Sequence, residues 1–229
     1  MIKPLIITIA ILISVSCYGQ STTYSTWKKE AQNDAKLLPK YGNKEKTQEQ
    51  KEADEELIKI AIQSDETREK ASDHHVQLGF NYLGRQDFKT AMNRFNQAWL
   101  LNPKNENVFW GFGGVYFSFN DFENAIKQYD DGLLLNPRST NILTDKATIF
   151  LTKFNQENSF SDLAIAIGLF ETSYGIDPKN QNTLFKLSVC YFLKSDCENA
   201  KKFYKECMAL GGKPITKEYT DALEETCKK

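Results

Sequence analysis

Residues that carry metal or catalytic chemistry are scarce in this sequence of 229 residues. Only two histidines occur, His74 and His75, and the five cysteines form no C-x2-C pair, so we expect no metal site. The sequence also lacks the nucleophile motif G-x-S-x-G and the zinc motif H-E-x-x-H. Its densest glycine cluster, Gly111-x-Gly113-Gly114, follows no predicted strand, so we interpret it as close helix packing and not as a phosphate loop. The sequence therefore predicts a protein that is not an enzyme and that uses no cofactor.

An excess of charge of one sign is also absent. Lysine and arginine together number 29 and aspartate and glutamate 30, which gives a formal net charge of −1 and an isoelectric point near 6.2. A protein that binds the phosphate backbone of nucleic acid needs a concentrated basic face, so we expect no nucleic-acid partner. The composition, 41% hydrophobic and 26% charged, is that of a folded globular protein.

Long hydrophobic runs are missing except at the start of the chain. Lys3 precedes an apolar run from Leu5 to Val15, and small residues follow it. This order is typical of a secretory signal, and a run of about eleven residues is too short to cross a bilayer. We therefore assign residues 1–19 to a signal peptide and expect an exported protein, periplasmic or associated with the outer membrane.

Two ways of processing this signal remain open. Cleavage after Gly19 would leave small residues, Cys17 and Gly19, at the two positions that a signal peptidase reads, and would release a soluble protein. Lipidation of Cys17 would instead anchor the chain, although Ser14 stands where bacterial lipoproteins usually carry leucine. Such a lipid is the only membrane contact that the sequence predicts.

The strongest feature of the sequence is a repeat with a period of 34 residues. Seven positions recur in register, since Leu78, Gly79, Tyr82, Ala91, Phe95, Ala98 and Pro103 are followed by Phe112, Gly113, Tyr116, Ala125, Tyr129, Gly132 and Pro137. The period continues to Pro214 with one insertion of seven residues, which we place in a longer turn around residues 152–161. The repeats are then 72–105, 106–139, 140–180 and 181–214, and their three- and four-residue apolar steps predict helices.

This pattern of small and large residues, with a proline at the end of each unit, resembles the tetratricopeptide repeat family. The resemblance covers roughly residues 72–214; the usual first-helix tryptophan is replaced by His75 and Phe109, and Lys146 stands where leucine is expected. It implies an all-α, right-handed superhelix of stacked helix pairs in which the first helices line a concave groove. Residues 20–71, with one or two helices, and a helix in residues 215–229 should cap the two ends.

The resemblance also identifies residues that should line the groove. We call the following set the groove row: Val76, Phe80, Leu83, Trp110, Phe117, Thr144, Thr148, Phe185, Val189 and Phe192. Its aromatic side chains would form an apolar patch suited to a peptide or helix of a partner protein, and replacing Trp110 and Phe185 together should weaken binding. Three alternatives remain: residues 20–46 fill the groove, the row packs between helices, or the chain is an enzyme or accessory subunit whose site forms only in three dimensions.

Four cysteines follow Cys17, and all lie in the last forty residues. An exported chain meets conditions in which disulfides persist. Cys197 falls in the turn of the last repeat, and Cys227 ends the capping helix that should finish near that turn. We therefore predict a Cys197–Cys227 disulfide, with Cys190 and Cys207 as buried thiols.

Overall fold

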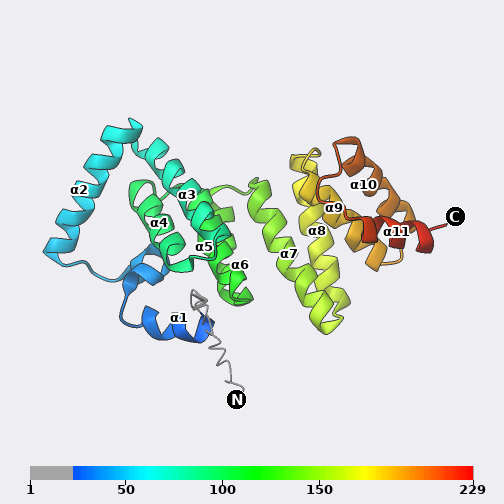
Figure 1. The fold of residues 1–229 in the computed structure, drawn as a ribbon, viewed down its shortest axis with the longest axis horizontal. Coiled ribbons are helices and arrows are strands. Elements are labelled where there is room, and N and C mark those ends of the chain that lie inside the picture. Colours follow the sequence, from blue (N-terminus) through cyan, green and yellow to red (C-terminus); the bar gives the residue numbers. More distant parts are fainter. Residues whose placement is uncertain (1–22, 229) are drawn as a thin grey trace, which may run out of the picture.

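The computed structural model describes residues 23–228, and within this range the chain is helical and contains no strand (Figure 1). Four antiparallel helix pairs follow one another along the long axis of the molecule. They are α3 (Arg68–Gly84) with α4 (Phe88–Leu101), α5 (Glu106–Ser118) with α6 (Phe122–Leu135), α7 (Thr140–Glu157) with α8 (Phe160–Ile176), and α9 (Gln181–Leu193) with α10 (Cys197–Ala209). None of the helices in this range is long and apolar enough to cross a membrane.

Polar residues at the turns fix where these helices begin. The carboxylates of Asp87, Asp121 and Asp196 each accept a hydrogen bond from a backbone N–H in the first turn of the following helix. Such a cap satisfies one of the N–H groups that a helix start leaves without a partner. The second helices of the first three pairs end at an asparagine or aspartate before a proline, a residue that disfavours helix in its predecessor.

The core forms where large rings meet small residues of neighbouring helices. Phe95 of α4 is completely buried, and its ring lies against Gly79 of α3 and Gly111 of α5. A Cβ atom at either glycine would come within 2.4 Å of that ring. The glycines therefore allow three helices to approach one aromatic side chain, which explains the small residues of the repeat.

The seven-residue insertion is not a loop, so that part of the sequence prediction is wrong. α7 has 18 residues and α8 has 17, compared with 13 and 14 in the preceding pair, and only Asn158 and Ser159 connect them. Asn158 has a left-handed backbone (φ 54°), which asparagine tolerates at a helix end. The extra residues lengthen both helices because the local sequence continues to supply apolar side chains, including Phe154 and Leu163, that pack together in the core.

Before the repeats lies a segment that we call the N-terminal clasp, residues 23–46. It contains α1 (Tyr24–Ala31) and two short 3-10 helices, η1 (Ala35–Leu37) and η2 (Pro39–Asn43). Trp27 is its buried anchor and packs on Phe119. Asn96 of α4, fully buried, accepts a hydrogen bond from the backbone of Tyr41 and donates to the carbonyls of Lys36 and Leu38.

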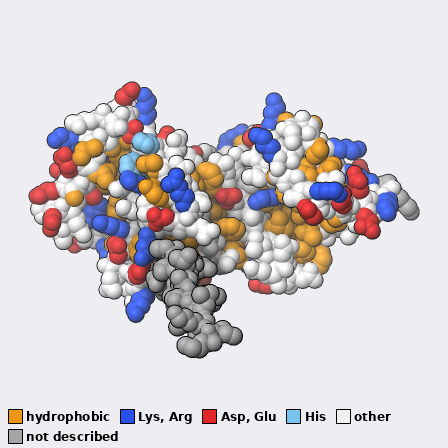
Figure 2. All heavy atoms as spheres, viewed as in Figure 1, with side chains coloured by type: hydrophobic (Ala, Val, Ile, Leu, Met, Phe, Trp, Pro, Cys, Tyr) orange, Lys and Arg blue, Asp and Glu red, His pale blue; other side chains and the backbone are white. Residues whose placement is uncertain are grey.

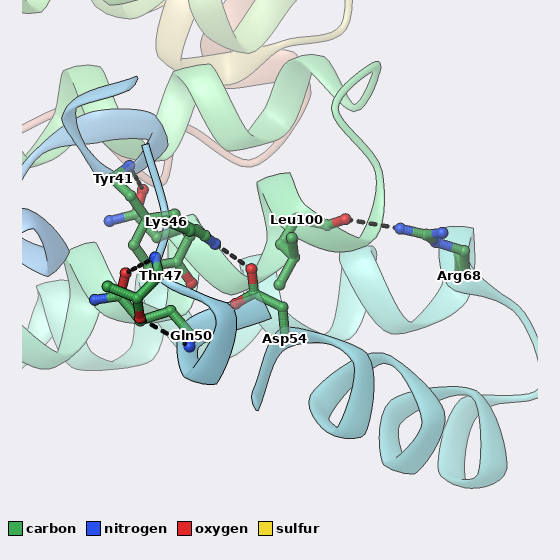
Figure 3. Close-up of polar contacts among 8 residues, drawn as sticks. Tyr41, Lys46, Thr47, Gln50, Asp54, Arg68 and Leu100 are labelled. Carbon is green, nitrogen blue, oxygen red and sulfur yellow. Dashed lines mark hydrogen bonds and ion pairs between the residues drawn. The ribbon is translucent and has the colours of Figure 1, made fainter. Parts of the chain in front are cut away.

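The helix α2 (Gln48–Asp65) connects the clasp to the repeats. Thr47 and Gln50 form a reciprocal capping box at its start, and Lys46 pairs with Asp54 one turn further on (Figure 3). After α2, Arg68 donates hydrogen bonds to the last carbonyls of α4, including that of Leu100 (Figure 3). The first two contacts fix the start of α2 next to the clasp, and the bonds of Arg68 join the start of α3 to the end of α4.

At the other end, α11 (Lys217–Thr226) covers the last repeat. Leu223 is buried there, and a disulfide joins Cys197 to Cys227. An apolar contact and a disulfide therefore both hold the capping helix on the last repeat.

Candidate functional site

The first half of the groove row forms a connected aromatic surface on α3 and α5. The rings of Phe80 and Trp110 lie 4.2 Å apart between centroids, and Leu83 lies close to Gly114. Phe117 contacts the ring of Phe122, and Val76 is buried. The rings of Phe80, Trp110 and Phe117 remain half-buried, so part of each is available to a ligand.

Trp110 is also fixed by a polar contact across the boundary between repeats. Its indole Nε1 donates a hydrogen bond of 2.6 Å to Oδ2 of Asp145 on α7. Burial raises the pKa of the Asp145 carboxyl, while the bond from Trp110 and the charge of Lys186 act in the opposite direction. The carboxylate accepts this one side-chain hydrogen bond within the described chain, which leaves acceptor capacity for a ligand.

Lys186 on α9 provides the complementary charge. Its ammonium donates a hydrogen bond of 2.6 Å to Oγ1 of Thr148, a member of the groove row. Burial lowers the pKa of Lys186, and the charge of Asp145 partly offsets this effect. No direct ion pair between Asp145 and Lys186 occurs in residues 23–228, so the two charges face the site separately.

Sequence reasoning missed these two residues, although a signal for them exists. Each occupies the sixth position of its repeat and directly follows a member of the groove row, Thr144 or Phe185. A charged residue beside a groove-lining one at the same position of two adjacent repeats is the pattern that could have identified them.

Replacing Asp145 by asparagine should stabilise the protein at pH 7. Because the folded pKa is raised, the folded state holds the proton more tightly than the unfolded chain, and ionisation at neutral pH costs stability. The gain should be present at pH 7 and disappear as the pH falls through the raised pKa and below the ordinary value of 3.8. Urea unfolding of both proteins across this range measures it. A less stable variant at pH 7 would mean that the contacts of the carboxylate outweigh its burial.

Thr144 does not belong to the groove surface. It is 4% exposed, and its hydroxyl lies 3.0 Å from that of Ser173 and 2.9 Å from that of Thr183. These three hydroxyls form a buried polar cluster between α7, α8 and α9. This position therefore faces the core, where the two partners satisfy its hydroxyl.

The last part of the groove row is covered by the capping helix. The ring of Tyr219 on α11 meets Phe185 and Phe192 edge-on, with centroids 5.4 and 5.9 Å apart. The Tyr219 hydroxyl lies 2.6 Å from that of Ser188, and Val189 is half-buried. The predicted continuous row of aromatic side chains is thus divided into an open part on α3 and α5 and a capped part on α9.

The N-terminal clasp lies away from the groove row. Its contacts are with α4 and α6, for example Lys40 with Asp131 at 2.8 Å and Lys89 with Glu30 at 2.6 Å, and with Phe109 and Phe119 at the two ends of α5. The second helices α4 and α6 receive the ion pairs, and on α5 the clasp meets Phe109 and Phe119, which are not members of the groove row. Residues 23–46 therefore do not fill the groove, and residues 20–22 lie outside the described range.

The sulfur atoms of the described chain offer no reactive thiol. Cys197 and Cys227 are joined in a disulfide, and Cys190 and Cys207 are buried. Burial raises the pKa of the Cys190 thiol to about 12, so it stays protonated at neutral pH. Over residues 23–228, no three side chains suited to a metal ion lie together, and Cys17 is outside that range.

Comparison with known proteins identifies the fold. No protein-family model matches the sequence, and no curated protein matches it either. Among solved structures, the chain is similar to TTC0263, a TPR protein of Thermus thermophilus, with a TM-score of 0.56 and 16% identity over 68% of this chain and 80% of that one. It is also similar to PilF of Pseudomonas aeruginosa (TM-score 0.55, 16% identity, 63% of each chain) and to yeast Tom70 (0.55, 18%, 90% of this chain).

These similarities define the class of protein by its fold. The chain spans 63% of the PilF structure and 42% of the Tom70 structure, so it corresponds to part of each. Together with the helix pairs described above, they confirm the fold predicted from the sequence. The protein is an all-α superhelix of tetratricopeptide-type helix pairs.

Proposed function

We propose that the protein is a non-catalytic scaffold that holds a segment of a partner protein in its concave groove. The observation that carries this proposal is the pair of charges, Asp145 and Lys186, that contact Trp110 and Thr148 of the groove row. They lie on adjacent repeats beside the open aromatic rings of Phe80 and Trp110, and each has hydrogen-bonding capacity left over. This combination of fixed polar groups and half-buried rings suits a protein segment, which carries both amides and apolar side chains.

The binding mode follows from the chemistry of these groups. A carboxylate accepts hydrogen bonds and an ammonium donates them, so Asp145 can bind a backbone N–H and Lys186 a backbone carbonyl of an extended segment. An apolar side chain of the segment would then pack on Phe80 and Trp110. Both polar residues are already held in place, by Trp110 and Thr148, so little conformational entropy is lost on binding.

The bacterial envelope is the proposed location. Residues 1–19 have the order of a secretory signal, and the disulfide between Cys197 and Cys227 suits a compartment outside the reducing cytosol. A lipid at Cys17 would tether the scaffold to a membrane, whereas cleavage after Gly19 would release it. In either case the scaffold would recruit its partner to an envelope complex.

An enzyme is the second candidate, because Asp145 and Lys186 are two titratable groups with shifted pKa values near one another. The described residues around them favour binding instead. The thiol closest to this pair, Cys190, is fully buried and protonated, and the neighbouring hydroxyl of Thr148 already donates to the backbone of Thr144. We therefore assign the pair to the recognition of a partner.

Affinity capture from envelope extracts tests the proposal. The tagged full chain should retain a partner. The double variant Asp145→Asn, Lys186→Gln should retain at least tenfold less of that partner. These two changes remove both charges and keep similar side-chain volumes. They are preferable to Phe185→Ala because Tyr219 already covers Phe185.

Leu134→Ser is the matched control, since Leu134 is 82% exposed on the second helix of its pair. It should leave capture unchanged. If the same proteins are retained by wild type, control and double variant, the groove is not the binding surface.

A further inference from the structure

A cleft of about 560 Å³ lies between α2 and the first repeat, and no residue of the groove row lines it. It is lined by residues of α2, α3 and α4, and it shares Ala53, Leu57 and Gln97 with a neighbouring cleft of about 520 Å³ beside the N-terminal clasp. In Figure 2 the two histidines, shown in pale blue, lie next to hydrophobic side chains on this part of the surface. Clefts of this size accommodate small molecules.

One wall of the cleft is apolar. Ala53, Leu57, Ile60 and Ala61 form a stripe along α2, and all four line the cleft. Only Ala61 is buried, and Ile60 is 56% exposed. Leu57 packs partly against the cluster of Ala61, Ala71 and Leu101, whereas Ala53 and Ile60 are exposed. An amphipathic helix normally buries such a stripe against its own protein, so part of the apolar face of α2 is open to a ligand.

The facing wall carries a cation that no carboxylate neutralises. Arg94 of α4 donates from Nη1 to Oε1 of Gln97 at 3.0 Å, but its Nε has no hydrogen-bond partner, and no ion pair to it occurs between residues 23 and 228. Nδ1 of His75 is likewise enclosed and unpartnered. Enclosed polar atoms without partners are rare in folded proteins, and the two residues that carry these atoms both line the cleft.

The carboxylates near the cleft already have other partners. Asp65 accepts from Nδ1 of His74 at 3.1 Å, and Glu56 pairs with Lys59 at 3.6 Å. Neither carboxylate pairs with Arg94, so its guanidinium has no counter-charge among the described residues. Burial and the charge of Arg94 lower the pKa of His75, which keeps its imidazole neutral at pH 7 and able to donate a hydrogen bond.

We propose that this cleft is a binding site for a small amphiphilic carboxylate, with its carboxylate on Arg94 and His75 and its apolar chain along Leu57 and Ile60. The carboxylate of the ligand would supply the missing counter-charge of Arg94. It would also accept hydrogen bonds from the planar guanidinium, whose N–H groups match the geometry of a carboxylate. The chain would cover the apolar stripe of α2. A wholly apolar ligand would leave the guanidinium desolvated and unpaired, so it fits the site less well.

Isothermal titration of the full chain with sodium octanoate tests the proposal. Octanoate should bind the wild type, and Arg94→Gln should weaken binding at least tenfold because it removes the charge but keeps a polar side chain. Arg85→Gln, an exposed arginine in the turn after α3, is the matched control and should bind like the wild type. Leu57→Asn, which removes part of the apolar wall, should also weaken binding.

Two control ligands separate the contribution of the carboxylate from that of the apolar tail of the ligand. 1-Octanol has the chain without the carboxylate and should bind at least tenfold more weakly, and sodium acetate should give no measurable heat. The imidazole resonances of His75 should shift on addition of octanoate in the wild type and not in Arg94→Gln. Equal binding of octanoate to the wild type and to Arg94→Gln would overturn the proposal. Equal binding of octanol and octanoate to the wild type would also overturn it.

A peptide that ends in leucine with a free C-terminal carboxylate offers the same two groups as octanoate. It tests whether the cleft binds the C-terminus of a peptide instead of a small molecule. If it binds far more tightly than octanoate, and its C-terminal amide does not bind, the small-molecule assignment is wrong and the cleft receives a peptide terminus. Binding no tighter than octanoate supports the small ligand. Neither result bears on capture through Asp145 and Lys186, so the two proposals can fail independently.

Discussion

Replacing Gly111 by alanine is expected to destabilise the protein by about 2 kcal/mol and to lower its Tm by roughly 4–8 °C. The added methyl group would lie 2.2 Å from Cε1 of Phe95. That ring is completely buried and also lies against Gly79, so it has no room to move. The strain should exceed the gain of about 1 kcal/mol that alanine offers over glycine in a helix. Thermal and urea unfolding measure the effect.

Gly168→Ala is the matched control, because this glycine is also inside a helix but its new Cβ would meet nothing within 4 Å. It should stabilise the protein by up to about 1 kcal/mol. Adding Phe95→Leu to the Gly111→Ala variant should recover part of the loss, since it removes the ring that causes the clash. Equal effects at Gly111 and Gly168 would show that the space around Phe95 is not the cause.

Removing the Cys197–Cys227 disulfide is expected to cost about 3 kcal/mol and to lower the Tm by roughly 6–12 °C. The bond joins residues 30 positions apart, so its loss gives the unfolded chain more freedom. It also frees α11, whose Tyr219 covers Phe185 and Phe192. Reduction should therefore expose these rings, and binding of a hydrophobic dye should increase.

The double variant Cys197→Ser, Cys227→Ser separates this bond from other effects of a reductant. Its Tm should match that of the reduced wild type and should not respond to reductant, because the remaining described cysteines are free thiols. A wild type whose Tm is unchanged after complete reduction, verified by mass, would contradict the expected role of the bond.

The repeat could be predicted from sequence because its cause is local and periodic. A ring such as Phe95 needs small residues opposite it, and these recur every 34 residues together with the proline that ends each pair. The aspartate caps add a second local signal at the same turns. For these reasons the helix pairs could be predicted from spacing, and the resemblance to the tetratricopeptide repeat family implied how they stack.

The arrangement of the candidate site could not be predicted in the same way. Whether Thr144 faces the groove or the core depends on which side chains of α8 and α9 lie next to it, here the hydroxyls of Ser173 and Thr183. The contact of Trp110 with Asp145 depends on the rotation between two adjacent repeats, which no spacing within one repeat specifies. The position of the N-terminal clasp depends on contacts between residues far apart in sequence, such as the buried amide of Asn96 with the clasp backbone and the ring of Trp27 with Phe119.

The two large hydrophobic clusters of the core meet at α7, and this has a consequence for cooperativity. One cluster extends from Trp27 to Ile149 and the other from Ala147 to Cys227, so α7 supplies side chains to both. Contacts in a repeat protein are mostly between neighbours, and each cluster can therefore act as a folding unit of its own. Trp110 belongs to the first unit and Lys186 lies on a helix of the second. A ligand held by both would join the two units thermodynamically, so that occupancy of the groove would raise the free energy needed to open the molecule at α7.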